Sequence, residues 1–252
     1  MNVLVLGGTT EASALARLLA DRGVVSTLSY AGRTANPRVP PIAVRIGGFG
    51  GVEGLVDYLR QTRVTHLVDA SHPFAATISA NAVAAAAIAT VPLIALTRPA
   101  WRPTAEDRWN LVADVDSALT ALACPPKRVL LALGRMHIEA FAAQPQHHYL
   151  LRFVDRPAAP PTLPRHRLVL DRGPFSIEGD RALMQTHAIE MVVSKNSGGS
   201  GAEAKLIAAR ELGLPVLMIE RPVLPERTEA FDPAEVLSWL GHGSAPGVER
   251  GV

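Results

Sequence analysis

An internal repeat constrains the fold of this chain more than any other feature. The apolar run THLVDA leads through Ser71 and a helical pattern to a second apolar run, LIALT, and AIEMVV leads in the same way through Ser194 to VLMIE. Ser71 and Ser194 are 123 positions apart, and so are Arg98 and Arg221, which follow the second runs. Self-similarity at a fixed spacing is typical of a repeated structural unit. The alternative is that any chain of alternating strands and helices resembles itself.

Short apolar runs alternate with helical patterns along the whole chain, which predicts parallel strands joined by crossover helices. We therefore expect an α/β fold of two similar Rossmann-like, doubly wound parallel-sheet halves with a cleft between them. The expected domains are residues 1–124 and 125–242, divided near the CPPK stretch, and 243–252 is expected to form a loose tail. Strands are predicted at 2–6, 24–30, 42–46, 65–69, 92–96, 128–133, 148–153, 167–170, 190–194 and 215–219. After the first helix, which ends at Gly23, helices are predicted at 51–61, 74–89, 114–123, 136–143, 176–187, 201–213 and 232–240.

Composition excludes several classes of protein. With 252 residues, 48% of them hydrophobic, the chain can bury a large core. No apolar run reaches the roughly 20 residues that span a bilayer, so we expect no membrane association and a cytoplasmic location. Cys124 is the only cysteine, which argues against an internal disulfide and a cysteine-based metal site. The net charge is +2, and no basic stripe interleaved with aromatic residues points to nucleic acid.

The cations are 22 arginines and 3 lysines. Arginine binds carboxylates and phosphates through two parallel hydrogen bonds, which would suit a polyanionic ligand. The other interpretation is a coding bias towards arginine and alanine, which would carry no function.

The first glycine turn is a candidate cofactor site. Gly7, Gly8, Thr9, Thr10 and Glu11 close a predicted strand and open a helix, whose first amides favour an anion. The stretch resembles a dinucleotide fingerprint, but Thr9 replaces the middle glycine. The threonine hydroxyls are expected to help hold phosphate, or the turn is purely structural.

Arg33 follows the second predicted strand, in SYAGRT, where an NAD enzyme usually carries an acid for the ribose 2′-hydroxyl. An arginine in place of the acid favours the 2′-phosphate of NADP. A solvated loop arginine is the alternative.

Ser71 and His72 follow the strand THLVD and are candidate catalytic residues. A histidine at a strand end can donate a proton near neutral pH. Equally, Ser71 can cap the following helix, and Pro73 is favoured in a first helical turn without any function.

The loop Lys195, Asn196, Ser197, Gly198 and Gly199 holds the equivalent place in the second half and is a second candidate cofactor site. Glycines and small hydroxyl residues allow backbone amides to curl around an oxyanion, and the lysine adds a positive charge. The lysine precedes the glycines, so this is not a Walker A loop, and nucleotide hydrolysis is not indicated. A glycine loop without a ligand is the alternative.

With these residues in view, the chain resembles the precorrin-6A reductase family of cobalamin biosynthesis. The resemblance extends through residue 240 and rests on the order of GGTTEA at 7, DASHPFAATISANA at 69, RPAW at 98, LGRM at 133, DRGPFS at 171 and VVSKNSGGSGAEAKLIAARELGLPVLMIERP at 192. Ser71 stands where the family usually has threonine.

The resemblance implies reduction of one double bond of the tetrapyrrole precorrin-6A to precorrin-6B, with NADPH as cofactor and without a metal. Arg98, Arg135 and Arg172 are then expected to bind the carboxylate arms of the substrate, and His72 or a bound water to deliver the proton. We expect a monomer. Three rival hypotheses remain: an NADPH reductase of another conjugated acid, a non-catalytic nucleotide sensor, and a sugar-nucleotide transferase.

Overall fold

The computed structural model describes residues 1–31, 40–157, 159–171, 173 and 175–242. The chain divides into two units, and each contains segments that are distant in sequence. The first unit comprises Met1–Arg98 and Val223–Val252, and the second comprises Pro99–Pro222. Two chain crossings, at 98–99 and at 222–223, connect them.

The first unit is a six-stranded parallel sheet flanked by helices, with strand order β12-β5-β4-β1-β2-β3. Its elements are β1 (Asn2–Leu6), α1 (Thr10–Asp21), β2 (Val25–Tyr30), β3 (Ala43–Ile46), α2 (Gly51–Gln61), β4 (His66–Asp69), α3 (Ala76–Ala89), β5 (Leu93–Leu96), β12 (Glu229–Ala230) and α7 (Pro233–His242).

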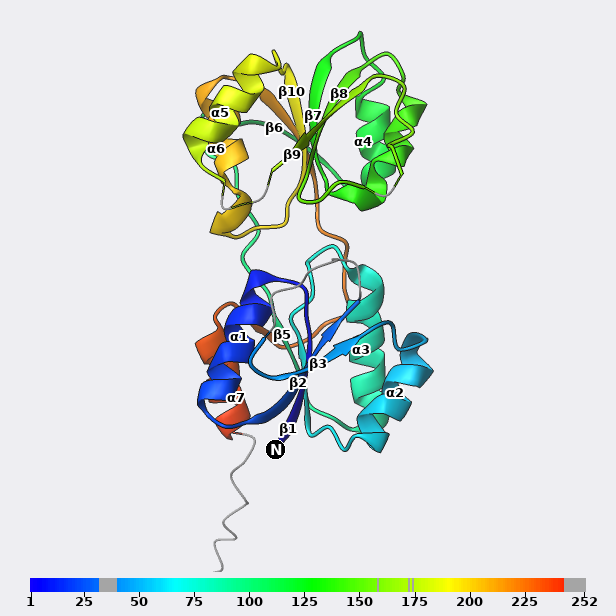
Figure 1. Ribbon diagram of the computed structural model, residues 1–252, viewed down its shortest axis with the longest axis vertical. Coiled ribbons are helices and arrows are strands. Elements are labelled where there is room, and N and C mark those ends of the chain that lie inside the picture. Colours follow the sequence, from blue (N-terminus) through cyan, green and yellow to red (C-terminus); the bar gives the residue numbers. More distant parts are fainter. Residues whose placement is uncertain (32–39, 158, 172, 174, 243–252) are drawn as a thin grey trace, which may run out of the picture. The chain divides into compact units, whose positions relative to one another are not determined.

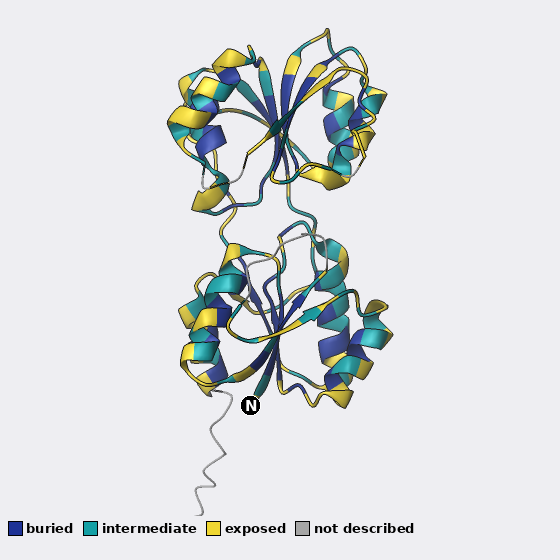
Figure 2. Cartoon of the chain, viewed as in Figure 1, coloured by how far each residue is buried: buried dark blue, intermediate teal, exposed yellow. Residues whose placement is uncertain are grey.

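Alternation along β1 shows why this sheet carries helices on both faces. Val3 and Val5 point to one face and pack in the cluster that includes residues of α1 and α7. Leu4 and Leu6 point to the other face and pack with residues of α2 and α3. All four side chains are buried, as expected for a central parallel strand covered on both sides (Figures 1 and 2).

The second unit is also a six-stranded parallel sheet, with strand order β6-β11-β10-β7-β8-β9. Its elements are β6 (Arg108–Val112), α4 (Val115–Ala121), β7 (Arg128–Ala132), the 3₁₀ turns η1 (Arg135–His137) and η2 (Glu139–Ala143), β8 (His148–Phe153), β9 (His166–Leu170), α5 (Ile177–Thr186), β10 (Met191–Lys195), η3 (Ser200–Ala202), α6 (Ala204–Glu211) and β11 (Pro215–Ile219). Figure 1 shows α5 and α6 on one face of this sheet and α4 on the other.

The two sheets have the same strand order. In each sheet, one outer strand is formed by a segment that the chain reaches only after crossing from the other unit. After β5 the chain leaves the first sheet, and β6 pairs in parallel with β11 of the second. After β11 it returns, and β12 pairs in parallel with β5. The doubly wound α/β fold is therefore confirmed. The observed units meet at 98–99 and at 222–223, whereas a single boundary near residue 124 was expected. Strand pairing assigns 99–124 to the second unit and returns 223–242 to the first.

The structure differs from the sequence-based prediction in three elements: β6, β12 and the segment 136–143. β6 has the sequence RWNLV, in which Arg108 and Asn110 are exposed, so it lacks the apolar run of a central strand. β12 is only two residues long. The helix expected at 136–143 is instead two 3₁₀ turns, neither with a side-chain cap, and Pro145 follows shortly afterwards. In the part of the chain that the structure describes, no helix is long and apolar enough to cross a bilayer.

Candidate functional site

Each sheet has one position where the strand order reverses, and ligands of open α/β sheets bind there, beyond the carboxyl ends of the strands. In the first unit this position lies between β1 and β4, and in the second between β7 and β10. The predicted residues 7–11 and 71–72 follow β1 and β4, while Arg135 and 195–199 lie at the ends of β7 and β10. Most of the predicted site residues are therefore at the two switch points. Arg33 and Arg172 lie outside the described residues.

The glycine turn after β1 uses its two glycines differently. A Cβ on Gly7 would lie 2.4 Å from Cδ1 of Leu28, so Gly7 permits close packing of the turn against the sheet. Gly8 has a φ of +128°, and a Cβ there would meet nothing within 4 Å. The backbone at Gly8 therefore borders open space at the start of α1, which is compatible with a close ligand approach.

The Thr9 hydroxyl joins the two loops of the first switch point. Its Oγ1 accepts a hydrogen bond from the amide of Ala12 at 3.1 Å, which caps α1. The same hydroxyl donates to the carbonyl of Ala70 at 2.9 Å, in the loop after β4. Its single proton is thus engaged within the protein, and Thr9 fixes the turn in this conformation rather than offering a donor to phosphate.

Arg98 and Glu11 form an ion pair in the first unit. Nη1 of Arg98 lies 3.2 Å from both carboxylate oxygens of Glu11. Burial alone would raise the pKa of Glu11, but the hydrogen bond from its own amide, the charge of Arg98 and the Thr10 hydroxyl outweigh burial and lower that pKa. In this conformation the charge of Arg98 is compensated by Glu11 at the start of α1.

Ser71 is held by Asp69, the last residue of β4. Its hydroxyl donates to Oδ1 of Asp69 at 2.6 Å, its amide does so at 3.1 Å, and its Oγ also lies 3.2 Å from Oγ of Ser79. Nδ1 of the exposed His72 accepts from the amide of Phe74 at 3.2 Å, so Nε2 carries the ring proton when His72 is neutral. Ser71 therefore positions the loop, and His72 presents a titratable side chain to solvent.

A buried ion pair supports this loop from a distant segment. Nη1 of Arg227, just before β12, lies 2.7 Å from Oδ2 of Asp69, with side-chain exposures of 7% and 1%. Arg227 also lies 3.4 Å from Oε1 of Glu229. The crossing that returns the chain to the first unit thus neutralises the aspartate that holds Ser71.

Lys195 is the last residue of β10 and the central charge of the second switch point. Burial lowers its pKa to about 8. The pKa of His137, in the 3₁₀ turn after β7, is lowered by its own burial and by the positive charge of Lys195. Arg135 is exposed in the same turn. This end of the sheet therefore gathers three cationic or titratable side chains.

Asn196 is a structural clamp. Its Oδ1 accepts from the amide of Trp101 at 2.8 Å and its Nδ2 donates to the Trp101 carbonyl at 3.0 Å, so both polar atoms pair with the chain crossing. Nε1 of Trp101 donates to the carbonyl of Gly199 at 3.0 Å. Arg221 donates to the carbonyls of Asn196 and Ser197 at 2.9 and 3.1 Å. A ligand role for the Asn196 side chain would require breaking this clamp.

The close packing of this loop against Pro99 and Arg221 requires a glycine at position 198. Its φ is +69°, and a Cβ there would lie 2.1 Å from the carbonyl oxygen of Pro99 and 2.6 Å from Nη2 of Arg221. Gly199 also has a positive φ, +79°. The expected phosphate-binding loop is therefore shaped first by its packing against residues 99–101.

Sequence reasoning missed the residues that support these loops. Arg227 and His137 lie in no quoted motif, and Trp101 lies in RPAW without an assigned role. Only the long-range contacts reveal what these three residues do. Arg152 is another example, since its guanidinium pairs with Asp180 and lies 3.8 Å from the centre of the Phe175 ring. Among the described residues, no group of three or more histidine, cysteine, aspartate or glutamate side chains is arranged to hold a metal.

Two doubly wound parallel sheets with glycine turns at their switch points define a protein of Rossmann-like units, the architecture of many nucleotide-dependent enzymes. The family model for precorrin-6x reductase CbiJ/CobK matches residues 2–241. The chain belongs to the precorrin-6A reductase family, and it is accordingly an oxidoreductase of cobalamin biosynthesis.

Individual relatives match over nearly their full length. The precorrin-6A reductase of Rhodobacter capsulatus is 55% identical over 251 residues, which cover 99% of both chains. That of Rhodococcus erythropolis is 47% identical and covers 95% of this chain and 97% of the relative. A solved structure of CobK precorrin-6A reductase is 53% identical, with a TM-score of 0.91 over 97% of this chain and 98% of that one.

The Asp69–Arg227 pair yields a stability prediction. Arg227→Met leaves a buried carboxylate without its counter-charge and should lower the free energy of unfolding by about 3–5 kcal/mol. The matched control is Arg181→Met, which breaks an ion pair with Glu211 whose side chains are 42% and 41% exposed, and should cost less than about 1 kcal/mol. Urea denaturation followed by circular dichroism measures both. Equal losses in the two variants would contradict a supporting role for the buried pair.

The low pKa of Lys195 yields a pH prediction. In protein labelled with ¹³C-lysine, one side-chain resonance should titrate near pH 8 and be absent in Lys195→Met. Since the unfolded chain holds this proton up to about pH 10.5, the wild type should gain stability relative to Lys195→Met between pH 8 and 10.5. A Lys195 resonance that stays unchanged until pH 10 would disprove the assignment.

Proposed function

We propose that this protein reduces one double bond of precorrin-6A, with NADPH as the hydride donor, to give precorrin-6B. The observation that carries the proposal is the 55% identity, over nearly the whole of both chains, with a relative named precorrin-6A reductase. The two rival enzyme hypotheses and the nucleotide sensor have no comparable support.

The residues of the first switch point fit a dinucleotide. Gly8 opens the backbone at the amino end of the twelve-residue helix α1, where amide dipoles favour a phosphate. Ser29 of β2 is in register with Leu6 of β1, so β2 ends beside the glycine turn. We assign the 2′-phosphate contact to Arg33, three residues after β2, and the phosphate contacts to the Gly7–Glu11 turn. The Lys195–Gly199 loop is the second candidate for a phosphate.

When bound, NADPH supplies a hydride from its nicotinamide ring. The protein's own residues then have three tasks: to bind the carboxylate arms of the substrate, to orient the accepting carbon and to deliver one proton to its neighbour. We assign arm binding to Arg98, Arg135 and Arg172, which requires Arg98 to share its guanidinium between Glu11 and a substrate carboxylate. Atoms balance because the double bond gains one hydride and one proton.

We assign proton delivery to His72. Its ring is exposed at the switch point, and its Nδ1 accepts a hydrogen bond from the amide of Phe74, so Nε2 carries the proton of the neutral ring. Ser71 is a positioning residue in this assignment, because its hydroxyl proton is directed to Asp69.

The cofactor assignment predicts a selective loss of affinity. Arg33→Ala should weaken NADPH binding by about 10- to 100-fold, the value of one or two charge-assisted hydrogen bonds, and leave NADH binding unchanged. Arg17→Ala is the matched control, since Arg17 is exposed in the middle of α1 and alanine favours the helix. Calorimetric titrations of both nucleotides measure the effect. Unchanged NADPH affinity in Arg33→Ala would refute the assignment of Arg33.

A further inference from the structure

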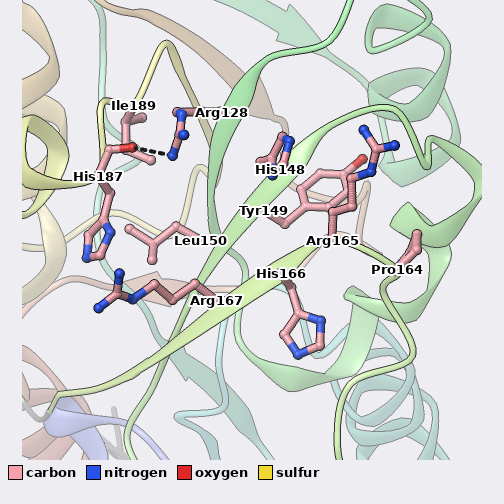
Figure 3. Close-up of a pocket in the computed structure, with 10 residues that line it drawn as sticks. All are labelled: Arg128, His148, Tyr149, Leu150, Pro164, Arg165, His166, Arg167, His187 and Ile189. Carbon is pink, nitrogen blue, oxygen red and sulfur yellow. Dashed lines mark hydrogen bonds between the residues drawn. The ribbon is translucent and has the colours of Figure 1, made fainter.

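The second unit has a pocket of about 330 Å³. It lies at the end of the sheet where the strands begin, and the switch point is at the end where they finish. Arg128, His148 and His166 are the first residues of β7, β8 and β9, and His187 lies in the turn before β10. The pocket is therefore at the amino ends of the strands, where none of the predicted cofactor or substrate residues lies. Arg165 and Arg167, at the start of β9, complete its polar lining (Figure 3).

The lining brings together three arginines and three histidines and includes no carboxylate. Three other arginines of this unit form ion pairs: Arg152 with Asp180, Arg181 with Glu211 and Arg210 with Asp107. By contrast, the guanidinium groups of Arg165 and Arg167 form no ion pair with any residue that the structure describes. The nearby Glu190 directs Oε2 to the backbone amide of Arg128, at 2.8 Å.

The positive charges reach into the pocket. Nη1 of Arg128 lies 3.5 Å from the carbonyl of His187, and Figure 3 shows the His187 ring on the same side as Arg167. The pKa of His187 is lowered by burial and then by the charges of Arg167 and Arg128. Both arginines are therefore close enough to the His187 ring to act on its charge, although all three arginines of the pocket are exposed.

We infer that this pocket is a second ligand site, which binds a diphosphate group. Guanidinium forks bind phosphate oxygens in pairs, and several cations that line one pocket from different strands suit an anion with more than one phosphate. A pocket of this volume is at the small end of ligand sites, so it fits a diphosphate, free or carried by a nucleotide, rather than a tetrapyrrole.

Calorimetric titration with inorganic diphosphate tests this inference. The wild type should show saturable binding, and Arg167→Gln should weaken it at least 10-fold. Arg181→Gln, in α5 and outside the pocket, is the control and should bind like the wild type. Arg128→Gln serves as a second variant if Arg167→Gln does not fold. The inference is overturned if the wild type shows no saturable binding at 10 mM, or if Arg167→Gln and Arg181→Gln bind equally.

Titration with ADP separates the two sources of the group. If Arg167→Gln weakens ADP and diphosphate in parallel, the pocket takes the diphosphate of a nucleotide. If only diphosphate binding is weakened, the pocket takes the free anion, and ADP binds elsewhere. Amide chemical-shift changes at Arg167 and His187, without changes at Gly8, are expected for diphosphate in either case. Changes confined to Gly8 would overturn the inference.

Discussion

The parallel pairing of β12 with β5 and of β6 with β11 is the constraint on which the rest of the structure depends. Each sheet is completed by an outer strand that the chain reaches only after crossing between the units. The crossing segments consequently run past the carboxyl ends of the strands, and the residues that hold the site loops come from them. Trp101 on one crossing clamps Asn196, and Arg227 on the other pairs with Asp69. Strand exchange and support of the site loops are thus one structural arrangement.

This arrangement divides the polar residues of the site into two groups. Thr9, Ser71 and Asn196 use their side-chain donors within the protein, and they fix the geometry of the turns. Gly8, with open space beside its backbone, and Lys195, with a pKa lowered by burial, remain suited to contact a ligand. A half-buried lysine near its pKa carries a charge that responds strongly to a nearby anion, since phosphate or carboxylate would stabilise its protonated form.

Much of the fold could be predicted because its signals are local. Short apolar runs indicated ten of the twelve strands in the described part of the chain, and the 123-residue offset indicated two similar halves. The exchange of β6 and β12 could not be predicted, because RWNLV is half exposed and β12 has two residues. At the site, the glycine turns could be placed from the sequence, but not their supports: Asp69 and Arg227 are 158 positions apart, and Trp101 and Asn196 are 95 apart. Such pairs leave no local pattern.

The central claim is that this chain transfers a hydride to precorrin-6A at a site supported by its exchanged strands. The most direct test is incubation of the purified protein with precorrin-6A and NADPH deuterated at the transferable position of the nicotinamide, with mass spectrometry of the tetrapyrrole. We expect a product that has gained one deuterium from the cofactor and one proton from the medium, with one NADPH oxidised for each product formed. An unchanged tetrapyrrole mass, with no oxidation of NADPH, would contradict the account.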